Sequence, residues 1–344
     1  MARITVLGAG LVGALVATEL SEDHYIKVID PDQEALVRVT QLAPAVELHD
    51  ARFDSPAQLA DCDLALNCLP GSVGHAALRR IIAAGVDCVD ISFTAEDPRT
   101  LDTVAREAGV TIVPDAGIAP GFSNLLAAEL AAQAPARLEI FVGGLPLRRE
   151  PPWEYAAPFS PIDVVAEYER PARLKRAGRD VAEPALSGCH PFRLPPGLVS
   201  ALPDGTALEA FLTDGLRSLL VLPVPEMAEF TLRYPGHAAR FAALRDSGAL
   251  AGERREATLA TLFRAWRLEP GEAEFTHLQV LGTFADGWSS MARTTGLTAC
   301  AFARELLAGT IAGPGVVMPE ACARALPAVR EYLQSRGVTV ERVA

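Results

Sequence analysis

The sequence lacks the short, regular spacings with which proteins hold structural metals. Its six cysteines never come as close as a CxxC pair, and its six histidines form no HExxH or comparable ligand pair. Metal sites and redox-active dithiols need ligands at such intervals. We therefore predict no bound metal, and we expect the cysteines to be reduced thiols that pack inside a cytoplasmic protein.

Long apolar runs and an excess of basic charge are also missing. Polar residues interrupt every stretch of about 18 residues, and no leader precedes the first apolar run, so we expect neither a membrane span nor secretion. The net charge of −12 and the pI near 5.1 disfavour nucleic acid and anionic membranes, because both bind basic surfaces. What remains is 344 residues, half of them hydrophobic, which is enough for two domains.

A glycine-rich motif follows the first apolar run. The run at 3–8 leads into Gly8-Ala-Gly10-Leu-Val-Gly13 and then into an alanine- and leucine-rich stretch, which predicts a strand, a tight turn and a helix. Gly8 would permit the turn, Gly10 would let the backbone approach a pyrophosphate, and Gly13 would let the helix lie close to the sheet. The pyrophosphate would then bind N–H groups at the helix N-terminus.

An acidic residue completes this dinucleotide-binding motif. Asp30 ends the second apolar run, about 20 residues after Gly8, where a carboxylate accepts hydrogen bonds from the adenosine ribose and repels a 2′-phosphate. The next residues are Pro31 and Asp32, so no arginine follows Asp30 that could bind the 2′-phosphate of NADP. The motif predicts NAD, with FAD or an ordinary glycine-rich turn as alternatives. The residues predicted to bind the cofactor here are Gly8, Gly10, Leu11, Val12, Gly13 and Asp30.

Strand and helix patterns alternate through the first third of the chain, which predicts a doubly wound parallel sheet. Strands are expected near 3–8, 26–30, 46–49, 64–69, 87–91 and 110–114, and helices near 11–21, 32–42, 73–84 and 98–108. Ligands bind at the carboxyl ends of such strands. The residues at two of these ends are predicted to lie near the cofactor, or else to be plain turn residues: Asn67, Leu69, Pro70, Ser92 and Phe93.

The pattern changes after residue 121. Alternating segments near 165–168, 181–186, 207–211, 227–233 and 275–282 predict a mixed or antiparallel sheet. The chain is expected to be helical again from Trp288 to about Ala308, and near 319–336. We therefore predict an α/β fold with two domains. Residues 1–121 and 288–344 would form an NAD-binding Rossmann domain, and 122–287 a second α/β domain for substrate binding and oligomerisation.

Several polar residues could carry chemistry. Asp115 would follow the sixth strand at the cofactor edge, where a carboxylate could accept a proton, hold an ammonium or simply stabilise a turn. Arg217 and Arg233 stand beside turn residues and could each grip a carboxylate in a bidentate manner. His237 has a suitable ordinary pKa, about 6.5, for proton transfer near neutrality. A polar wall facing the nicotinamide would be formed by Arg217, Arg233, Tyr234 and His237, although each taken singly is more often a surface or structural residue.

Longer motifs together resemble the saccharopine dehydrogenase superfamily. They are Val89-Asp-Ile-Ser-Phe93, the segment Pro114 to Asn124, Gly143-Gly-Leu-Pro146, Thr213-Asp-Gly-Leu-Arg217, Thr231-Leu-Arg-Tyr-Pro-Gly-His237 and Ser290-Met-Ala-Arg-Thr-Thr-Gly296. The resemblance covers nearly the whole chain and, within the superfamily, is greatest to the L-lysine 6-dehydrogenases. It implies a Rossmann domain completed by C-terminal helices, a mixed α/β substrate domain, and a homodimer or larger homo-oligomer.

The activity that this resemblance implies is NAD-dependent oxidative deamination of the side-chain amine of L-lysine. The semialdehyde product would cyclise to piperideine-6-carboxylate. Arg217 and Arg233 would bind the substrate carboxylate, and Asp115 or His237 would accept the amine proton. The residues expected to bind the amino-acid substrate are Thr213, Asp214, Arg217, Arg233 and Tyr234.

Two alternatives stay open. Saccharopine or another secondary amine could be the substrate, although saccharopine reductases carry a cysteine just before the Gly-Gly-Leu-Pro segment, where this chain has Val142. The other alternative is a protein that binds NAD as a sensor or scaffold without turnover.

Overall fold

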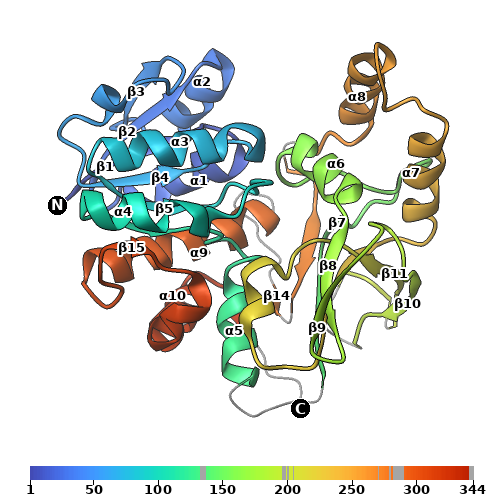
Figure 1. Ribbon diagram of the computed structural model, residues 1–344. Coiled ribbons are helices and arrows are strands. Elements are labelled where there is room, and N and C mark those ends of the chain that lie inside the picture. The colour runs from blue at the N-terminus through green and yellow to red at the C-terminus, as the bar shows by residue number, and fades with distance from the viewer. Residues whose placement is uncertain are drawn as a thin grey trace. The chain divides into compact units, whose positions relative to one another are not determined.

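The computed structural model describes residues 1–131, 137–195, 199, 201–203, 205–269, 271–278, 280–281 and 290–340. As far as they are described, these residues divide into two compact units (Figure 1): unit 1 is Met1–Glu129 with Ala292–Arg336, and unit 2 is Leu130–Met291 with Gly337–Ala344. The division differs from the predicted boundaries, because most of the helix that begins at Phe122 belongs to unit 1. The predicted boundary at 287/288, and Trp288 itself, lie outside the described residues.

Unit 1 is built on a parallel sheet of seven strands in the order β15-β6-β5-β4-β1-β2-β3. The strands are β1 (Arg3–Leu7), β2 (Tyr25–Asp30), β3 (Glu47–Asp50), β4 (Leu64–Asn67), β5 (Asp87–Asp90), β6 (Thr111–Val113) and β15 (Gly315–Val316). The order reverses between β1 and β4, which is the topology of a doubly wound sheet, so this prediction is confirmed. Only β15 was not predicted, because two residues are too few to show a pattern.

Helices connect and cover these strands: α1 (Leu11–Leu20), α2 (Gln33–Leu42), α3 (Gly71–Ala83), α4 (Asp102–Ala108), α5 (Phe122–Ala131), α9 (Ser290–Leu307) and α10 (Leu326–Ser335). Short 3-10 turns, η1, η2 and η4, lie at Pro56–Leu59, Pro98–Leu101 and Pro319–Ala325. Helix α9 packs closely on α1, since a Cβ atom at Gly296 would lie 2.4 Å from Cδ2 of Leu15. A C-terminal helix therefore completes unit 1, as the resemblance implies.

Unit 2 contains a mixed sheet, also as predicted. Its order is β10-β11-β12-β7-β13, and β8 pairs with both β12 and β9. The strands are β7 (Arg137–Pro146), β8 (Ala172–Arg176), β9 (Arg179–Glu183), β10 (His190–Arg193), β11 (Ala207–Leu212), β12 (Glu226–Arg233) and β13 (Glu274–His277). Strands β7 and β12 run parallel, and the other pairs are antiparallel. A separate ribbon pairs β14 (Val280–Leu281) with β16 (Thr339–Val340).

The remaining elements of unit 2 are α6 (Pro161–Glu169), α7 (His237–Asp246), α8 (Arg254–Ala265) and the 3-10 turn η3 (Arg217–Val221). Helix α6 corrects one prediction, because residues 165–168 are helical rather than extended. β-Branched residues such as Val164 and Val165 are common in strands. Here, however, Pro161 occupies the first helical turn, where proline is favoured. The buried residues Val164, Val165 and Tyr168 are spaced as on one face of a helix.

One face of the unit 2 sheet carries polar side chains, and we call it the polar face. Successive side chains of a strand alternate between faces, so Glu229, Thr231 and Arg233 of β12 share this face. Thr231 pairs with Val142 of β7. Helix α6 covers the polar face, because the Tyr168 hydroxyl contacts Arg233. Buried polar groups are thus concentrated between a sheet and a helix.

Each unit has a hydrophobic core of its own. In unit 1 the core includes Leu7, Ile81 and Ile112, and in unit 2 it includes Trp266 and Phe241. Among the helices that the structure describes, none has both the length and the apolar composition needed to cross a bilayer.

Candidate functional site

The glycine-rich loop of unit 1 has the geometry that the motif predicts. Gly8 has a φ of +96°, and a Cβ atom there would lie 2.8 Å from the carbonyl oxygen of Cys68. A Cβ atom at Gly13 would lie 2.0 Å from the carbonyl oxygen of Gly8. At Gly10, in contrast, a Cβ atom would meet no atom of the protein within 4 Å. Gly8 and Gly13 are therefore required by the fold, whereas Gly10 leaves open space beside the backbone.

Helix α1 begins at this open position. Gly10 is its N-cap and offers no side chain to the first N–H groups, and the first turn contains no acidic residue. Leu11 and Val12, the first helical residues, are exposed and partly exposed, respectively. The unshielded N–H groups and the helix dipole favour an anion at this point.

The carboxylate of Asp30 is held beside the loop by two backbone groups. Its Oδ2 accepts a hydrogen bond from the N–H of Ala9 at 2.6 Å, and its Oδ1 accepts one from the N–H of Asp32 at 2.7 Å. A carboxylate has about four acceptor sites, so acceptor capacity is left for ribose hydroxyls. The residues around the loop thus fit a dinucleotide.

The side chains at the ends of β4 and β5 form a buried network. Nδ2 of Asn67 donates to Asp90 at 2.8 Å, and the hydroxyl of Ser92 donates to the same Asp90 oxygen at 2.6 Å. A Cβ atom at Gly74, in α3, would lie 2.1 Å from the Ser92 hydroxyl. Asn67 and Ser92 are therefore buried residues that link the ends of β4 and β5 to helix α3. Three other predicted cofactor residues of this region, Leu69, Pro70 and Phe93, are partly or fully exposed.

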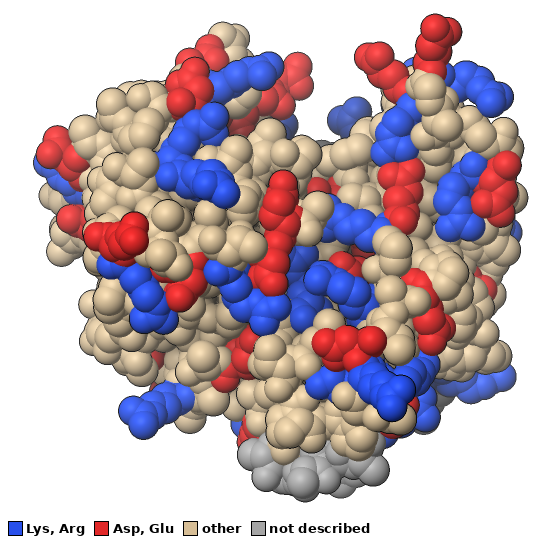
Figure 2. Space-filling model, in the orientation of Figure 1, with Lys and Arg blue, Asp and Glu red and all other residues tan. Residues whose placement is uncertain are grey.

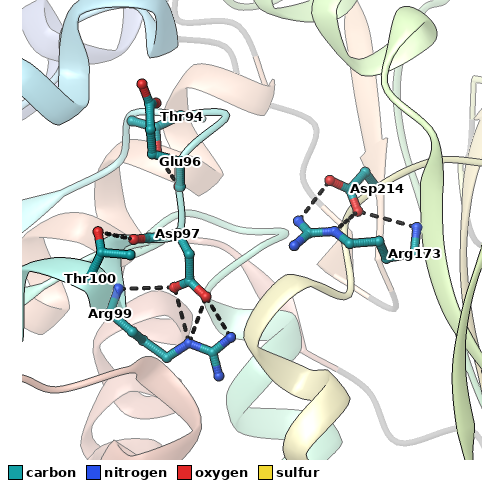
Figure 3. A network of polar contacts seen from close by, with 7 residues as sticks. All are labelled: Thr94, Glu96, Asp97, Arg99, Thr100, Arg173 and Asp214. Atoms are coloured by element: carbon teal, nitrogen blue, oxygen red, sulfur yellow. Dashed lines mark hydrogen bonds and ion pairs between the residues drawn. The ribbon is translucent and has the colours of Figure 1, made fainter.

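Asp115 lies just after β6 in a tight loop. Its φ is +52°, and its side chain is buried. Nearby, Asp97 accepts hydrogen bonds from Nε and Nη2 of Arg99 (Figure 3) at 3.0 and 2.6 Å. That bond raises the pKa of Arg99, and the charges of Glu320 and Asp115 act in the same direction. Asp115 thus sits in a charged part of unit 1, at the carboxyl end of the sheet, as predicted.

Arg233 is buried at the centre of the polar face of unit 2, with 3% of its surface exposed. Its Nε donates to the Tyr168 hydroxyl at 2.7 Å, its Nη1 donates to the carbonyl of Leu232 at 2.8 Å, and its guanidinium lies 4.4 Å from the ring centre of Tyr155. Burial alone would lower the pKa of Arg233, but Tyr155, Tyr168 and Glu167 outweigh that effect and raise it. No carboxylate of the described residues lies within ion-pair distance.

His237 is buried rather than exposed on a wall, and its catalytic role stays a prediction. It begins α7 inside the aromatic core, against the rings of Trp153, Tyr155, Tyr168 and Trp266. Nδ1 lies 3.2 Å from the Trp153 carbonyl and Nε2 lies 3.2 Å from the Tyr168 hydroxyl. Burial, followed by the charge of Arg233, lowers the pKa of His237 to about 3. A neutral imidazole with both nitrogens engaged fits a structural role.

Tyr234 is held by contacts within unit 2, and its role in substrate binding stays a prediction. Its hydroxyl donates to the carbonyl of Pro146 at 2.9 Å, which ties the end of β12 to the end of β7. Arg149 covers its ring at 4.4 Å, and the side chain is almost fully buried.

The other residues predicted to bind substrate lie just before η3, at Thr213 and Asp214, and at its first residue, Arg217. Asp214 forms an ion pair with Arg173, whose Nε and Nη2 donate to it at 2.7 and 2.8 Å (Figure 3). The hydroxyls of Thr213 and Thr231 are 2.9 Å apart. Arg217 is buried with a φ of +45°. Asp214 is thus neutralised by the protein itself, which does not favour a role in binding an ammonium.

Three buried polar residues on or against the polar face were not predicted. Glu167 accepts a hydrogen bond from Thr231, and burial raises its pKa. Glu274 and Thr276 lie on β13 and are buried. In the sequence, Glu274 and Thr276 alternate with Phe275 and His277, which suggests a polar side facing water. The structure instead buries that side.

The chain matches family models over almost its whole length. Residues 4–113 match the saccharopine dehydrogenase NADP binding domain, and residues 117–338 match the saccharopine dehydrogenase C-terminal domain. Residues 4–113 are therefore an NAD(P)-binding domain, in agreement with the geometry of the glycine-rich loop.

Individual proteins are similar at low identity. Mitochondrial alpha-aminoadipic semialdehyde synthase of Mus musculus is 25% identical over 256 residues, which cover 68% of this chain and 27% of that protein. The enzyme of Bos taurus is 27% identical over 194 residues, covering 52% and 21%, respectively. The chain therefore matches about a fifth to a quarter of the length of these relatives.

A solved structure shares the fold. Saccharopine dehydrogenase (L-Glu forming) from Saccharomyces cerevisiae matches with a TM-score of 0.74, covers 99% of both chains and is 18% identical. Together with the C-terminal domain model, which alone spans residues 117–338 and hence more than half of the sequence, this establishes that the chain belongs to the saccharopine dehydrogenase family.

Proposed function

We propose that this protein is a cytoplasmic enzyme for the NAD-dependent oxidative deamination of the side-chain amine of L-lysine, whose semialdehyde product cyclises to piperideine-6-carboxylate. The observation that carries the proposal is the guanidinium of Arg233, which is buried without a carboxylate partner among the described residues. A buried charge is costly unless it is paired. The carboxylate of an amino acid would supply a direct ion pair, which the hydrogen bonds of Arg233 to Tyr168 and Leu232 do not.

The residues of unit 1 support NAD as the cofactor. The open backbone at Gly10 and the uncapped start of α1 suit a pyrophosphate, and Asp30 suits two ribose hydroxyls. The hydride from the amine-bearing carbon would pass to bound NAD. Because Asp30 would repel a 2′-phosphate, we expect NADP to be a poorer cofactor, although the matching family model is named for NADP.

The reaction also needs a proton acceptor, since the nitrogen must be neutral when the hydride leaves. Of the two residues predicted for this role, His237 has a pKa of about 3 and sits in the core. Asp115 remains a candidate, at the carboxyl end of the unit 1 sheet. Arg217 remains a candidate for a second contact with the substrate carboxylate.

Saccharopine is the second candidate substrate, because the family bears its name. Val142 argues against it, since saccharopine reductases have a cysteine at that position. Val142 is buried on β7 beside Thr231 of the polar face, so its replacement by cysteine would alter the same surface that holds Arg233.

The decisive experiment measures NADH formation by absorbance with purified protein at alkaline pH, where more of the amine is neutral. L-lysine and saccharopine are compared as substrates, and NAD and NADP as cofactors. Reduction of NAD by lysine supports the proposal. Turnover of saccharopine alone would change the substrate, and tight NAD binding without any turnover would favour a sensor or scaffold.

We further propose a homodimer or larger homo-oligomer, as the family resemblance implies, with a small amino acid rather than nucleic acid or membrane as its binding partner. On the face drawn in Figure 2, Lys and Arg are interspersed with Asp and Glu, and the net charge is −12. Light scattering coupled to gel filtration would give the number of subunits.

A further inference from the structure

Strand β13 places two polar side chains in the interior of unit 2. Glu274 pairs with Pro146 of β7, and Thr276 pairs with Gly144. Residues two apart on a strand point to the same face, and only 5% of Glu274 and none of Thr276 is exposed. The pair therefore forms a buried polar edge of the sheet.

Two of the three side-chain oxygens of this pair have no hydrogen-bond partner among the described residues. Oε1 of Glu274 accepts a hydrogen bond from the N–H of Met291 at 2.9 Å. Oε2 of Glu274 and Oγ1 of Thr276 are buried and have no partner among the residues that the structure describes. Leaving such groups unpaired costs about 1–3 kcal/mol each. A ligand that donates to both oxygens would remove that cost.

Arg233 lies in the same row of the sheet. Thr231 pairs with Val142, so Arg233, two residues further, falls level with Gly144, and Gly144 pairs with Thr276. Neighbouring strands are about 4.8 Å apart, so the outer members of the row are about 10 Å apart. This is the separation of the backbone positions of Arg233 and Thr276, and it allows side chains from the two strands to contact opposite ends of one small substrate, one end negative and the other positive.

The residues between these ends link them. Tyr155 stacks on the guanidinium of Arg233, and its pKa, which burial raises to about 12, also responds to the charge of Glu274. Gly144 has no side chain, which leaves room for Pro158 and Met291 to pack against the sheet. Met291 in turn orients Glu274 through its N–H. The acid and the cation are therefore held by one packed cluster.

We propose that Glu274 and Thr276 bind the reacting amine of the substrate, that Glu274 accepts its proton, and that Arg233 holds the carboxylate at the other end. This assignment rests on the proposed function. In the step, an N–H bond of the substrate ammonium breaks, its electron pair stays on nitrogen, and the proton goes to Oε2 of Glu274. The neutral amine can then release hydride from its carbon to NAD.

The environment of Glu274 suits this exchange. Burial raises the pKa of Glu274 to about 8, whereas an ordinary glutamate has a pKa of about 4.3 and a lysine ammonium about 10.4. Because the pKa of Glu274 is closer to that of the ammonium, proton transfer from the ammonium to Glu274 is less unfavourable. The proton acceptor is thereby assigned to unit 2 rather than to Asp115 or His237.

The test compares Glu274→Gln with Glu139→Gln, a matched change at an exposed residue of β7. Binding of L-lysine and of L-norleucine, which lacks the side-chain amine, is measured by calorimetry in the presence of NADH, so that no turnover occurs. In the wild type and in Glu139→Gln, lysine should bind at least tenfold more tightly than norleucine. In Glu274→Gln that difference should vanish while norleucine binding is unchanged.

Turnover gives a second readout. Loss of a proton acceptor costs about 10²–10⁴-fold in rate, so kcat with lysine and NAD should fall at least 100-fold in Glu274→Gln and severalfold in Thr276→Val. Asp115→Asn is the comparison for the competing assignment. If Glu274→Gln fails to fold, as circular dichroism would show, Glu274→Asp keeps the charge, shortens its reach and should lower kcat by at least tenfold.

The failures are distinguishable. If the wild type neither binds nor oxidises lysine, the proposed function fails and the assignment with it. If the wild type oxidises lysine and Glu274→Gln, or Glu274→Asp in its place, retains kcat within about threefold, the assignment alone is wrong. If Glu274→Gln weakens the binding of lysine and norleucine equally, the assignment is also wrong. Glu274 would then contact the amino-acid end that the two ligands share, and not the side-chain amine.

Discussion

The glycine-rich loop of unit 1 and the polar face of unit 2 hold their key residues in different ways. In the loop, Gly8, Gly10 and Gly13 follow one another in the sequence, and Asp30 is fixed by backbone groups of the same segment. On the polar face, Arg233 comes from β12 and Glu274 from β13, with β7 between them. One site is local in the sequence, and the other exists only after the sheet has formed.

This difference decides what each site tolerates. The loop depends on the absence of side chains, so its failures are steric. The polar face depends on the burial of charge and hydrogen-bonding groups, so its failures are electrostatic. Substitutions that separate steric from electrostatic loss therefore test whether the two regions are as different as their geometry suggests.

The largest effect is expected in the loop. In Gly13→Ala the new Cβ atom would lie 2.0 Å from the carbonyl oxygen of Gly8, which is backbone and cannot move aside cheaply. Overpacking of this kind costs about 1–3 kcal/mol, and we expect NAD affinity to fall more than 100-fold. Thermal unfolding and NAD titration by fluorescence measure both.

Gly10→Ala is the matched control. Its Cβ atom would meet nothing in the protein within 4 Å, so stability should stay within about 0.5 kcal/mol of the wild type. NAD affinity should still fall, because the pyrophosphate needs the close approach of the backbone. A Gly10→Ala protein that binds NAD as the wild type does would contradict this reading of the loop.

The next largest effect is expected at Arg233. Arg233→Met should raise KM for lysine about 100-fold, since losing a buried partner of a charge costs about 2–5 kcal/mol. Stability should change by less than about 1 kcal/mol, because the variant also removes a buried charge that has no carboxylate within ion-pair distance among the described residues. NAD affinity should not change. Steady-state kinetics and urea unfolding provide the measurements.

Arg173→Met makes the same substitution in a paired arginine. Arg173 neutralises the buried Asp214, although the Arg173 side chain itself is 40% exposed, so its loss should destabilise the protein by about 1–3 kcal/mol and leave KM for lysine nearly unchanged. If the two variants lose the same stability, the guanidinium of Arg233 is not special, and the main support for a carboxylate-bearing substrate is gone.

The sequence predicts unit 1 well because its signals are local. Strand ends, the glycine spacing and Asp30 all lie within one third of the chain, and the structure has the expected parallel order. The seventh strand, β15, was not predicted, because its position depends on pairing with β6 rather than on its own residues.

The polar face is harder to predict because burial is a tertiary property. His237 and Arg233 stand in one motif, yet Arg233 lies on the sheet and His237 inside an aromatic cluster. Alternation in β13 correctly separates Glu274 from Phe275, but it gives no sign that both faces of that strand are covered. The types of residue in these motifs could be read from the sequence, but whether each side chain is buried or exposed could not.

A pH titration of stability tests the structural role of His237. The unfolded state takes up a proton below the ordinary pKa of about 6.5, whereas the folded state does so only near 3. The unfolded state therefore binds more protons in this window, and stability is lost as the pH falls from about 6.5 toward 3.

His237→Gln should remove this part of the acid sensitivity. We expect the difference in unfolding free energy between wild type and variant to change by up to about 1.4 kcal/mol per pH unit in that window, as urea unfolding at several pH values would show. At alkaline pH, kcat/KM of the variant should remain within a few-fold of the wild type. A loss of more than 100-fold there would instead support the catalytic role of His237.

The smallest effect is expected for a variant of Tyr234, which distinguishes a residue that binds substrate from one that only stabilises the fold. Tyr234→Phe keeps the ring under Arg149 and removes only the hydrogen bond to the carbonyl of Pro146. One such bond contributes about 1 kcal/mol to stability, so the unfolding free energy should fall by that amount while KM for lysine stays the same. If Tyr234 touched substrate, KM would rise and stability would hardly change. Because the two outcomes differ in which quantity moves, even a small effect decides whether this residue belongs to the sheet or to the ligand.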